Sequence, residues 1–243
     1  MRPASVHGPV AFALFLAGCA LAGCVLTLPF DELTGGGPRP TSYYPLDETA
    51  GATVPDVVGP NPGVLEADGD ELPAWTTAGK RGGAVDFTDD GWIEVPNLSE
   101  AKFPARGTIA FWVKLRARAG SDVTALFLAI EPDDVAPLGV YVAPGGVYFE
   151  REGRGGDKRE SHSEGAPLDT WLLVAAGWDV DADETVLLVR PEGRAPFPIQ
   201  RGGFPSGFAL EVPTVILSAA LGTLDEVRYY DRLLTDEELK VLD

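Results

Sequence analysis

Paired carboxylates are the first chemistry to examine, because a retaining glycoside hydrolase needs two of them about 5 to 5.5 Å apart. A strand would present such a pair as a Glu-x-Asp-x-Glu run, and the sequence contains none. The acidic run 131–134 includes Pro132, which interrupts a strand. The remaining candidates stand singly and are Glu48, Glu94 and Glu226. Glycoside hydrolysis is therefore the least favoured function.

Histidine is the second residue type to consider, since nucleophilic catalysis needs a base within reach of a hydroxyl or thiol. Outside the N-terminal leader the sequence has one histidine, His162, which lies in the polar stretch 161–164. No strand-to-helix turn is expected there, so we interpret His162 as a solvated loop residue. The sequence predicts no catalytic residue, and we expect the protein not to be an enzyme.

Lipid attachment is the chemistry that the two cysteines suggest. Cys19 and Cys24 each end a Leu-Ala-Gly-Cys box, directly behind the apolar run 10–16. With Arg2 at the start, this pattern predicts a secretory signal peptide and acylation of one cysteine. The apolar region before the second box is longer, so Cys24 is favoured and Cys19 is the alternative. The run is shorter than the ~20 residues that cross a bilayer.

The sequence divides into three parts. We predict a lipoprotein signal peptide over residues 1–23, a flexible tether rich in Gly and Pro over 24–40, and one domain over 41–243. Neither Ala20 nor Val25 is the aspartate that retains some lipoproteins at an inner membrane. We therefore expect an exported protein, lipid-anchored to the cell envelope, at the outer membrane where there is one.

The charge balance limits the partners. There are 37 acidic and 19 basic residues, for a net charge of -18, and loss of Arg2 with the leader makes it -19. Such a surface repels phosphate, so nucleic acid is not expected as a partner. Membrane contact is expected only through the N-terminal lipid.

Hydrophobic periodicity predicts an all-β domain. The segment 108–115 alternates with period two, and 138–142 and 147–150 read as a hairpin across a Pro-Gly-Gly turn. The apolar segments 171–178 and 185–189 are expected to be inner strands of a sandwich. The stretch 150–166, rich in Gly and mixed charge, is expected to be a long surface loop or a mobile insertion.

One short helix is expected at the C-terminus. Thr235 and Glu238 have the spacing of a capping box, in which each side chain bonds the backbone amide of the other residue. Leu239 and Leu242 then face the sandwich.

Four segments, in this order, match one family pattern. They are Tyr-Tyr-Pro-Leu-Asp-Glu at 43–48, Gly-Lys-Arg-Gly-Gly-Ala-Val-Asp-Phe at 79–87, Gly-Thr-Ile-Ala-Phe-Trp-Val at 107–113 and Leu-Asp-Glu-Val-Arg-Tyr-Tyr at 224–230. The chain resembles a laminin-G-like domain of the concanavalin A-like lectin and glucanase superfamily over nearly all of 43–242. The resemblance implies a two-sheet antiparallel jelly-roll sandwich whose chain ends lie close together.

The resemblance also implies one structural Ca²⁺. Its expected ligands are Asp47 and Asp225, from the two terminal motifs, with Asp89 or Asp90 as a third. The alternative is that Asp47 and Asp225 cap turns or pair with Arg228.

Sugar binding on such a sandwich uses exposed aromatic rings as stacking platforms. Trp75 and Trp92 lie among Pro, Gly and Asp and are the candidate ligand-binding residues, whereas Trp112, Trp171 and Trp178 lie in strands and are expected in the core. The leading hypothesis is a non-catalytic, envelope-anchored module that binds a glycan or an envelope or extracellular protein. The alternative is a structural envelope component without a small ligand, and a glycoside hydrolase is third.

Overall fold

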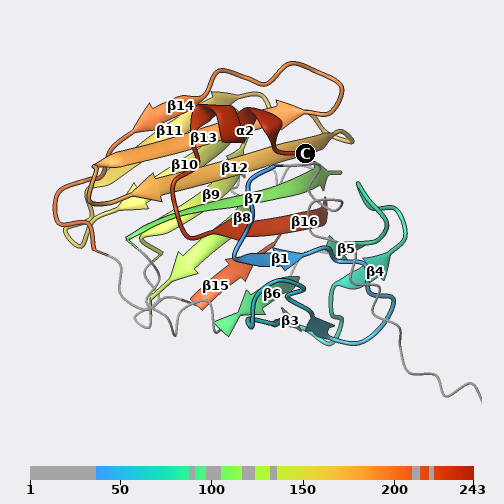
Figure 1. The fold of residues 1–243 in the computed structure, drawn as a ribbon. Helices are drawn as coiled ribbons and strands as arrows, with labels where there is room; N and C mark the ends of the chain where they lie inside the picture. Colours follow the sequence, from blue (N-terminus) through green and yellow to red (C-terminus); the bar gives the residue numbers. More distant parts are fainter. Residues whose placement is uncertain are drawn as a thin grey trace, which may run out of the picture.

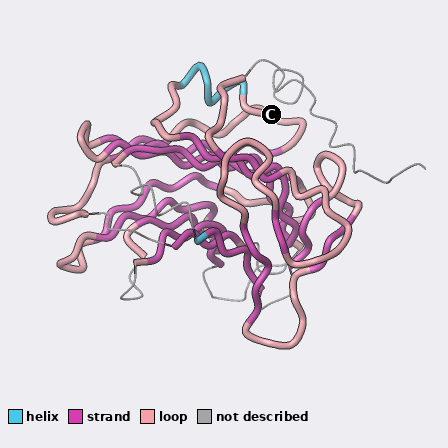
Figure 2. The backbone as a smooth tube through the Cα atoms, turned by 60° about the horizontal axis from the view of Figure 1, so that its bottom comes forward, coloured by secondary structure: helices cyan, strands magenta, loops and turns pink. Residues whose placement is uncertain are grey.

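The computed structural model describes residues 37–87, 91–96, 105–116, 124–131, 136–209, 214–218 and 222–243. These residues form two antiparallel sheets packed face to face, with a short helix on the outer side of one of them (Figures 1 and 2). This confirms the predicted all-β fold, a two-sheet antiparallel sandwich with one short C-terminal helix. The segment predicted to be a signal peptide and both cysteines lie outside the described residues. Within the described part of the chain, no helix is long and apolar enough to cross a membrane.

Sheet A contains eight strands. Their order is β14 (Gln200–Gly202), β13 (Glu184–Pro191), β12 (Trp171–Asp179), β7 (Arg106–Leu115), β16 (Gly222–Tyr230), β5 (Ala84–Phe87) and β4 (Ala74–Thr76), with β1 (Ser42–Tyr44) also paired to β16. The two segments predicted as inner strands are β12 and β13, and neither lies at an edge.

Sheet B also contains eight strands. Their order is β11 (Lys158–Glu164), β10 (Gly146–Glu152), β9 (Leu138–Ala143), β8 (Thr124–Ile130), β15 (Thr214–Leu217), β6 (Gly91–Val95), β3 (Gly63–Ala67) and β2 (Thr53–Val54). The predicted hairpin across Pro144 is the β9–β10 pair.

Strand β7 shows why the sheets pack as they do. Ile109 and Phe111 belong to the core between the sheets, whereas the alternate residues Ala110 and Trp112 belong to a second buried cluster on the outer face of sheet A. Both faces of β7 are therefore buried, and the second cluster needs a cover.

Helix α2 (Asp236–Val241) provides that cover. The predicted capping box is present: Thr235 accepts a hydrogen bond from the Glu238 amide, and the Glu238 carboxylate accepts one from the Thr235 amide at 3.0 Å. Leu239 and Leu242 are buried in the second cluster. The expectation that these two leucines face the sandwich is confirmed, and the prediction that the helix closes the domain is tested by substitution below. The helix lies over sheet A (Figure 2).

The prediction of a loop over 150–166 is wrong. Strand β10 continues to Glu152, and residues 158–164 form β11 at the edge of sheet B. The inward positions of β11 are Ser161 and Ser163, both buried, so the strand carries no apolar alternation.

A buried arginine explains how such a polar strand packs. Arg151 donates to Phe149 O at 2.6 Å, to Ser161 Oγ at 3.0 Å and to Gly203 O at 3.0 Å. Burial lowers the pKa of Arg151 to about 10. Its guanidinium joins β10 and β11 to the segment after β14, and the serine hydroxyl is one of its acceptors.

Candidate functional site

Aromatic side chains form a row on the outer face of sheet B. Tyr141 on β9 pairs with Tyr148 on β10, and Tyr148 pairs with His162 on β11. Directly paired residues of antiparallel strands project from the same face. The alternate residues of β10, Val147 and Phe149, are buried in the core, so the aromatic row faces outward.

Tyr148 and His162 form a parallel stack, with ring centroids 4.3 Å apart and planes inclined by 9°. His162 Nε2 lies 3.3 Å from Gly145 O, which holds the imidazole against the hairpin turn. The loop placement predicted for His162 is therefore wrong, because the residue stands on a paired strand. Its ring extends the tyrosine surface.

Two glycines allow the tyrosine rings to lie close to the sheet. A Cβ at Gly139 would come within 2.4 Å of the Tyr141 ring, and a Cβ at Gly145 would come within 2.4 Å of Tyr148 Oη. Any side chain at either position would displace the ring above it. The backbone thus provides room for both aromatic rings.

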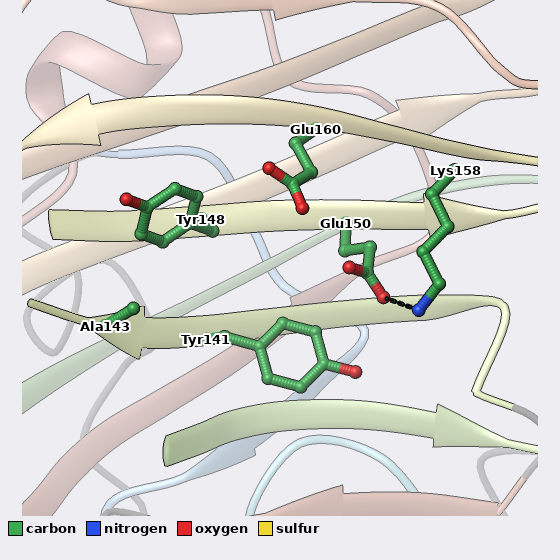
Figure 3. A pocket seen from close by; sticks show the side chains of 6 residues that line it. All are labelled: Tyr141, Ala143, Tyr148, Glu150, Lys158 and Glu160. Carbon is green, nitrogen blue, oxygen red and sulfur yellow. Dashed lines mark hydrogen bonds and ion pairs between the residues drawn. The ribbon is translucent and has the colours of Figure 1, made fainter. Parts of the chain in front are cut away.

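A hollow of about 340 Å³ lies beside these rings (Figure 3). Its lining residues are Tyr141, Ala143, Tyr148, Glu150, Lys158 and Glu160. Glu150 and Glu160 are directly opposite each other on β10 and β11. Lys158 Nζ lies 2.9 Å from Glu150 Oε1 and 3.0 Å from Glu152 Oε2. The hollow therefore combines aromatic surface with hydrogen-bond acceptors.

The hydroxyl of Tyr141 stays protonated at neutral pH. Burial raises the pKa of Tyr141 to about 12, and the negative charge of Glu150 adds to the effect. A protonated phenol both donates and accepts hydrogen bonds. Tyr141 thus offers the hollow a polar contact as well as a ring face.

Trp92, a predicted ligand-binding residue, belongs to the same face. Successive pairings connect one row of residues across the sheet, namely Glu94, Ile216, Leu128, Gly139, Glu150 and Glu160. Trp92 lies two residues before Glu94, and Tyr141 lies two residues after Gly139. Because each strand runs antiparallel to the next, both aromatic residues lie on the same side of this row. Three strand spacings of ~4.8 Å place β6 and β9 ~14 Å apart.

The Trp92 ring is partly exposed, while its Nε1 atom is buried and finds no hydrogen-bond partner among the described residues. Trp92 therefore adds a fourth ring to the aromatic row of Tyr141, Tyr148 and His162.

Trp75 lies elsewhere. It is on β4 at the edge of sheet A, its Nε1 donates to Gly51 O at 2.7 Å, and its ring packs against the main core. The structure therefore does not bring the two predicted platforms together. Trp112, Trp171 and Trp178 are buried, as predicted.

Asp47 and Asp225 both hold the loop 79–83. Asp47 Oδ1 accepts a hydrogen bond from Gly83 N at 2.6 Å, and Asp225 Oδ2 accepts one from Arg81 N at 2.9 Å. Burial raises the pKa of Asp225 to about 8. The two carboxylates meet at one loop, as expected for the terminal motifs.

The calcium site that the resemblance implies stays a prediction. The described residues contain no group of three or more His, Cys, Asp or Glu side chains that could hold a metal ion. The third predicted ligand, Asp89, and its alternative Asp90 lie outside the described residues. Arg228 pairs with Glu226, which also accepts a hydrogen bond from Tyr43 Oη at 2.8 Å.

The sequence reasoning missed Glu152 and Glu160 because it placed them in a loop, and it missed Glu150 because this residue stands where the predicted strand 147–150 meets that loop. The signal that would have found them is the Tyr-x-Glu-x-Glu alternation at 148–152, which continues the strand pattern of residues 147–150. Glu150 and Glu152 share the ammonium of Lys158. This is an ion-paired arrangement, unlike the free acid and nucleophile of a glycoside hydrolase.

The two antiparallel sheets define the class of the fold, a β-sandwich. No family model and no curated protein matches the chain. Among solved structures it is similar to domain 4 of AbnA, a GH43 extracellular arabinanase from Geobacillus stearothermophilus, in complex with arabinotriose. The TM-score is 0.61 at 19% identity, over 85% of this chain and 100% of that domain.

Toxin domains are also similar. The binding domain of Paraclostridial Mosquitocidal Protein 1 has a TM-score of 0.62 at 13% identity, over 83% of this chain and 51% of that chain. The binding domain of Botulinum Neurotoxin DC, in complex with SialylT, has a TM-score of 0.60 at 7% identity, over 81% and 51%. The chain thus spans about half the length of these toxin domains, and the likeness concerns the fold.

Proposed function

We propose that this protein binds glycans, without cleaving them, through the outer face of sheet B. The observation that carries the proposal is the row of Tyr141, Tyr148 and His162 beside a hollow lined by carboxylates. Sugar rings present C–H faces that pack on aromatic rings, and hydroxyl groups that donate to carboxylate oxygens. The similarity to a domain solved with arabinotriose supports the same conclusion.

The dimensions of the hollow favour a glycan over a protein as the ligand. About 340 Å³ lies at the lower end of the ~300 to 1,000 Å³ found for small-ligand pockets. A stable protein interface would bury about 800 Å² on each partner. A short stretch of a saccharide chain fits a hollow of this volume. Trp92 extends the surface for further sugar units along the same face.

We also propose that this domain is related by descent to laminin-G-like domains. We propose further that an acylated N-terminus anchors it to the cell envelope. The favoured acylated residue is Cys24, with Cys19 as the alternative, and the tether 24–40 then joins the lipid to the sandwich. The domain would thus present its glycan-binding face outside the membrane, at the outer membrane where there is one.

A glycan array probed with the full chain in detergent tests the binding function. We expect hits that weaken about 10-fold in Tyr148→Ala, because one stacking ring is lost. Trp75→Phe is the matched control, since Trp75 lies on the other sheet and should leave the hits unchanged. An array without hits, or hits indifferent to Tyr148→Ala, would reject the proposal and favour a structural envelope component.

A further inference from the structure

We infer that the hollow on sheet B selects saccharides that carry free amino groups over neutral ones, and excludes acidic saccharides. This inference rests on the proposed glycan-binding function and names the ligand class. It follows from how the charges are arranged around the aromatic row.

The outer face of sheet B is strongly acidic. In the described strands of this sheet, the outward charged positions comprise one ammonium, that of Lys158, and the carboxylates of Glu66, Glu94, Glu150, Glu152, Glu160 and Glu164. The remaining basic residues of β10 and β11, Arg151 and Arg159, occupy the opposite face. An anionic ligand would meet this excess of negative charge at close range.

The one ammonium is already engaged. Lys158 Nζ contacts Glu150 and Glu152 at 2.9 and 3.0 Å, and these contacts raise the pKa of Lys158. A sugar carboxylate or sulfate needs a cationic donor, typically an arginine or lysine. To bind here it would have to displace two glutamates from Lys158, which makes uronic, sialic and sulfated sugars poor ligands.

Glu160 is in the opposite situation. Glu160 lies directly across from Glu150 on the neighbouring strand. Like charges at directly opposed positions destabilise a sheet. Lys158 offsets the charge of Glu150, whereas Glu160 has no hydrogen-bond or ion-pair partner among the described residues. Figure 3 shows its carboxylate directed over β10, between Tyr148 and Glu150.

An ammonium group on a ligand in the hollow would therefore gain two contacts. It would pair with the Glu160 carboxylate, and it would lie beside the Tyr148 ring, whose face attracts cations. A neutral hydroxyl in the same place would make only a hydrogen bond. The stacking surface would bind either sugar, and the charge on Glu160 would provide the preference.

The test compares three hexasaccharides by calorimetry on the full chain at pH 6: the hexamer of glucosamine, its fully N-acetylated counterpart, and a hexamer of galacturonic acid. We expect the glucosamine hexamer to bind most tightly and the galacturonate hexamer not to bind. Glu160→Gln should reduce the preference for the amine by about two- to fivefold, the effect of one solvent-exposed ion pair. Lys158→Met frees two carboxylates and should increase it.

Hexalysine is the control for diffuse attraction to a protein of net charge -18. Binding of hexalysine as tight as that of the glucosamine hexamer would overturn the inference, as would tight galacturonate binding or an unchanged preference in Glu160→Gln. If the array gives hits confined to acidic glycans that are lost in Tyr148→Ala, the glycan-binding function stands and this inference fails. Failure of all three hexamers to bind also overturns the inferred preference for amino sugars. The glycan array then decides separately whether the protein binds glycans.

Discussion

Tyr148 and His162 stack in parallel on neighbouring strands, with ring centroids 4.3 Å apart. We expect the imidazole to act as aromatic surface. His162→Phe should then retain glycan affinity, whereas His162→Ala should lower it by about 2- to 10-fold, the value of one aromatic contact. Titration with the strongest array ligand measures this. An equal loss in both variants would instead indicate that the imidazole nitrogens make the contact.

The buried carboxyl of Asp225 should make stability depend on pH. Burial raises its pKa to about 8 in the folded protein, from 3.8. The folded state therefore holds a proton that the unfolded state releases, and this contribution is complete below pH 4 and lost as the pH rises through 8. The free energy of unfolding should fall from pH 5 to pH 8 by at most ~1.4 kcal/mol per pH unit.

Urea unfolding at several pH values tests this, with Asp225→Asn as the variant. The fall should be smaller in Asp225→Asn, and it should persist in 0.5 M salt, because burial is its main cause and long-range charge interactions are screened. A wild-type protein that becomes more stable between pH 5 and pH 8 would contradict the assignment.

Helix α2 offers a matched pair of substitutions. Leu239 is fully buried, and Val241, two residues along, is 57% exposed. Leu239→Ala should lower the free energy of unfolding by about 2 to 5 kcal/mol, because it leaves a cavity under the helix. Val241→Ala should change it by less than about 0.5 kcal/mol. Similar values for the two variants would show that the helix does not close the core.

Calcium should act on this protein through its overall charge. Asp47 and Asp225 already accept backbone hydrogen bonds from the loop 79–83. Millimolar Ca²⁺ should therefore shift the Tm of the wild type and of Asp225→Ala by the same amount, through screening. A shift in the wild type that Asp225→Ala loses, and that Mg²⁺ does not reproduce, would instead identify the structural ion that the laminin-G-like resemblance implies.

The anchor is tested by mass spectrometry of the N-terminus from membrane-extracted protein. We expect acyl groups on Cys24, and loss of partitioning into detergent in Cys24→Ala but not in Cys19→Ala. Acyl groups on Cys19 would move the signal-peptide boundary and leave the lipoprotein proposal intact. A Cys19→Ala/Cys24→Ala double variant that still partitions into detergent would reject it.

The fold was predictable where burial follows a regular period. Strand β7 alternates apolar residues, and α2 carries a capping box, so both are visible in the sequence. Strand β11 was not, because its inward positions are Ser161 and Ser163 and its packing depends on Arg151, which lies on another strand. A hydrophobic pattern cannot reveal a strand whose interior partner is polar.

The site was less predictable than the fold. Trp92 was a candidate because of its local surroundings, but its position in a row with Tyr141 and Tyr148 depends on the order of five strands, β6, β15, β8, β9 and β10, which is not their order in the sequence. Trp75 has similar surroundings and lies on the other sheet. Composition around a tryptophan does not determine which sheet it occupies.

The chain enters the domain on the side away from the aromatic row. Gly37 and Pro38 share a crevice with Leu242, beside the helix on sheet A, and the Thr41 amide donates to Tyr229 O at 2.7 Å. A solid support attached through residues preceding Gly37 would therefore hold the domain from the side of sheet A. The aromatic row on sheet B would then face away from the support. Capture of the protein on a sensor chip through its N-terminus should therefore leave the proposed glycan-binding face accessible.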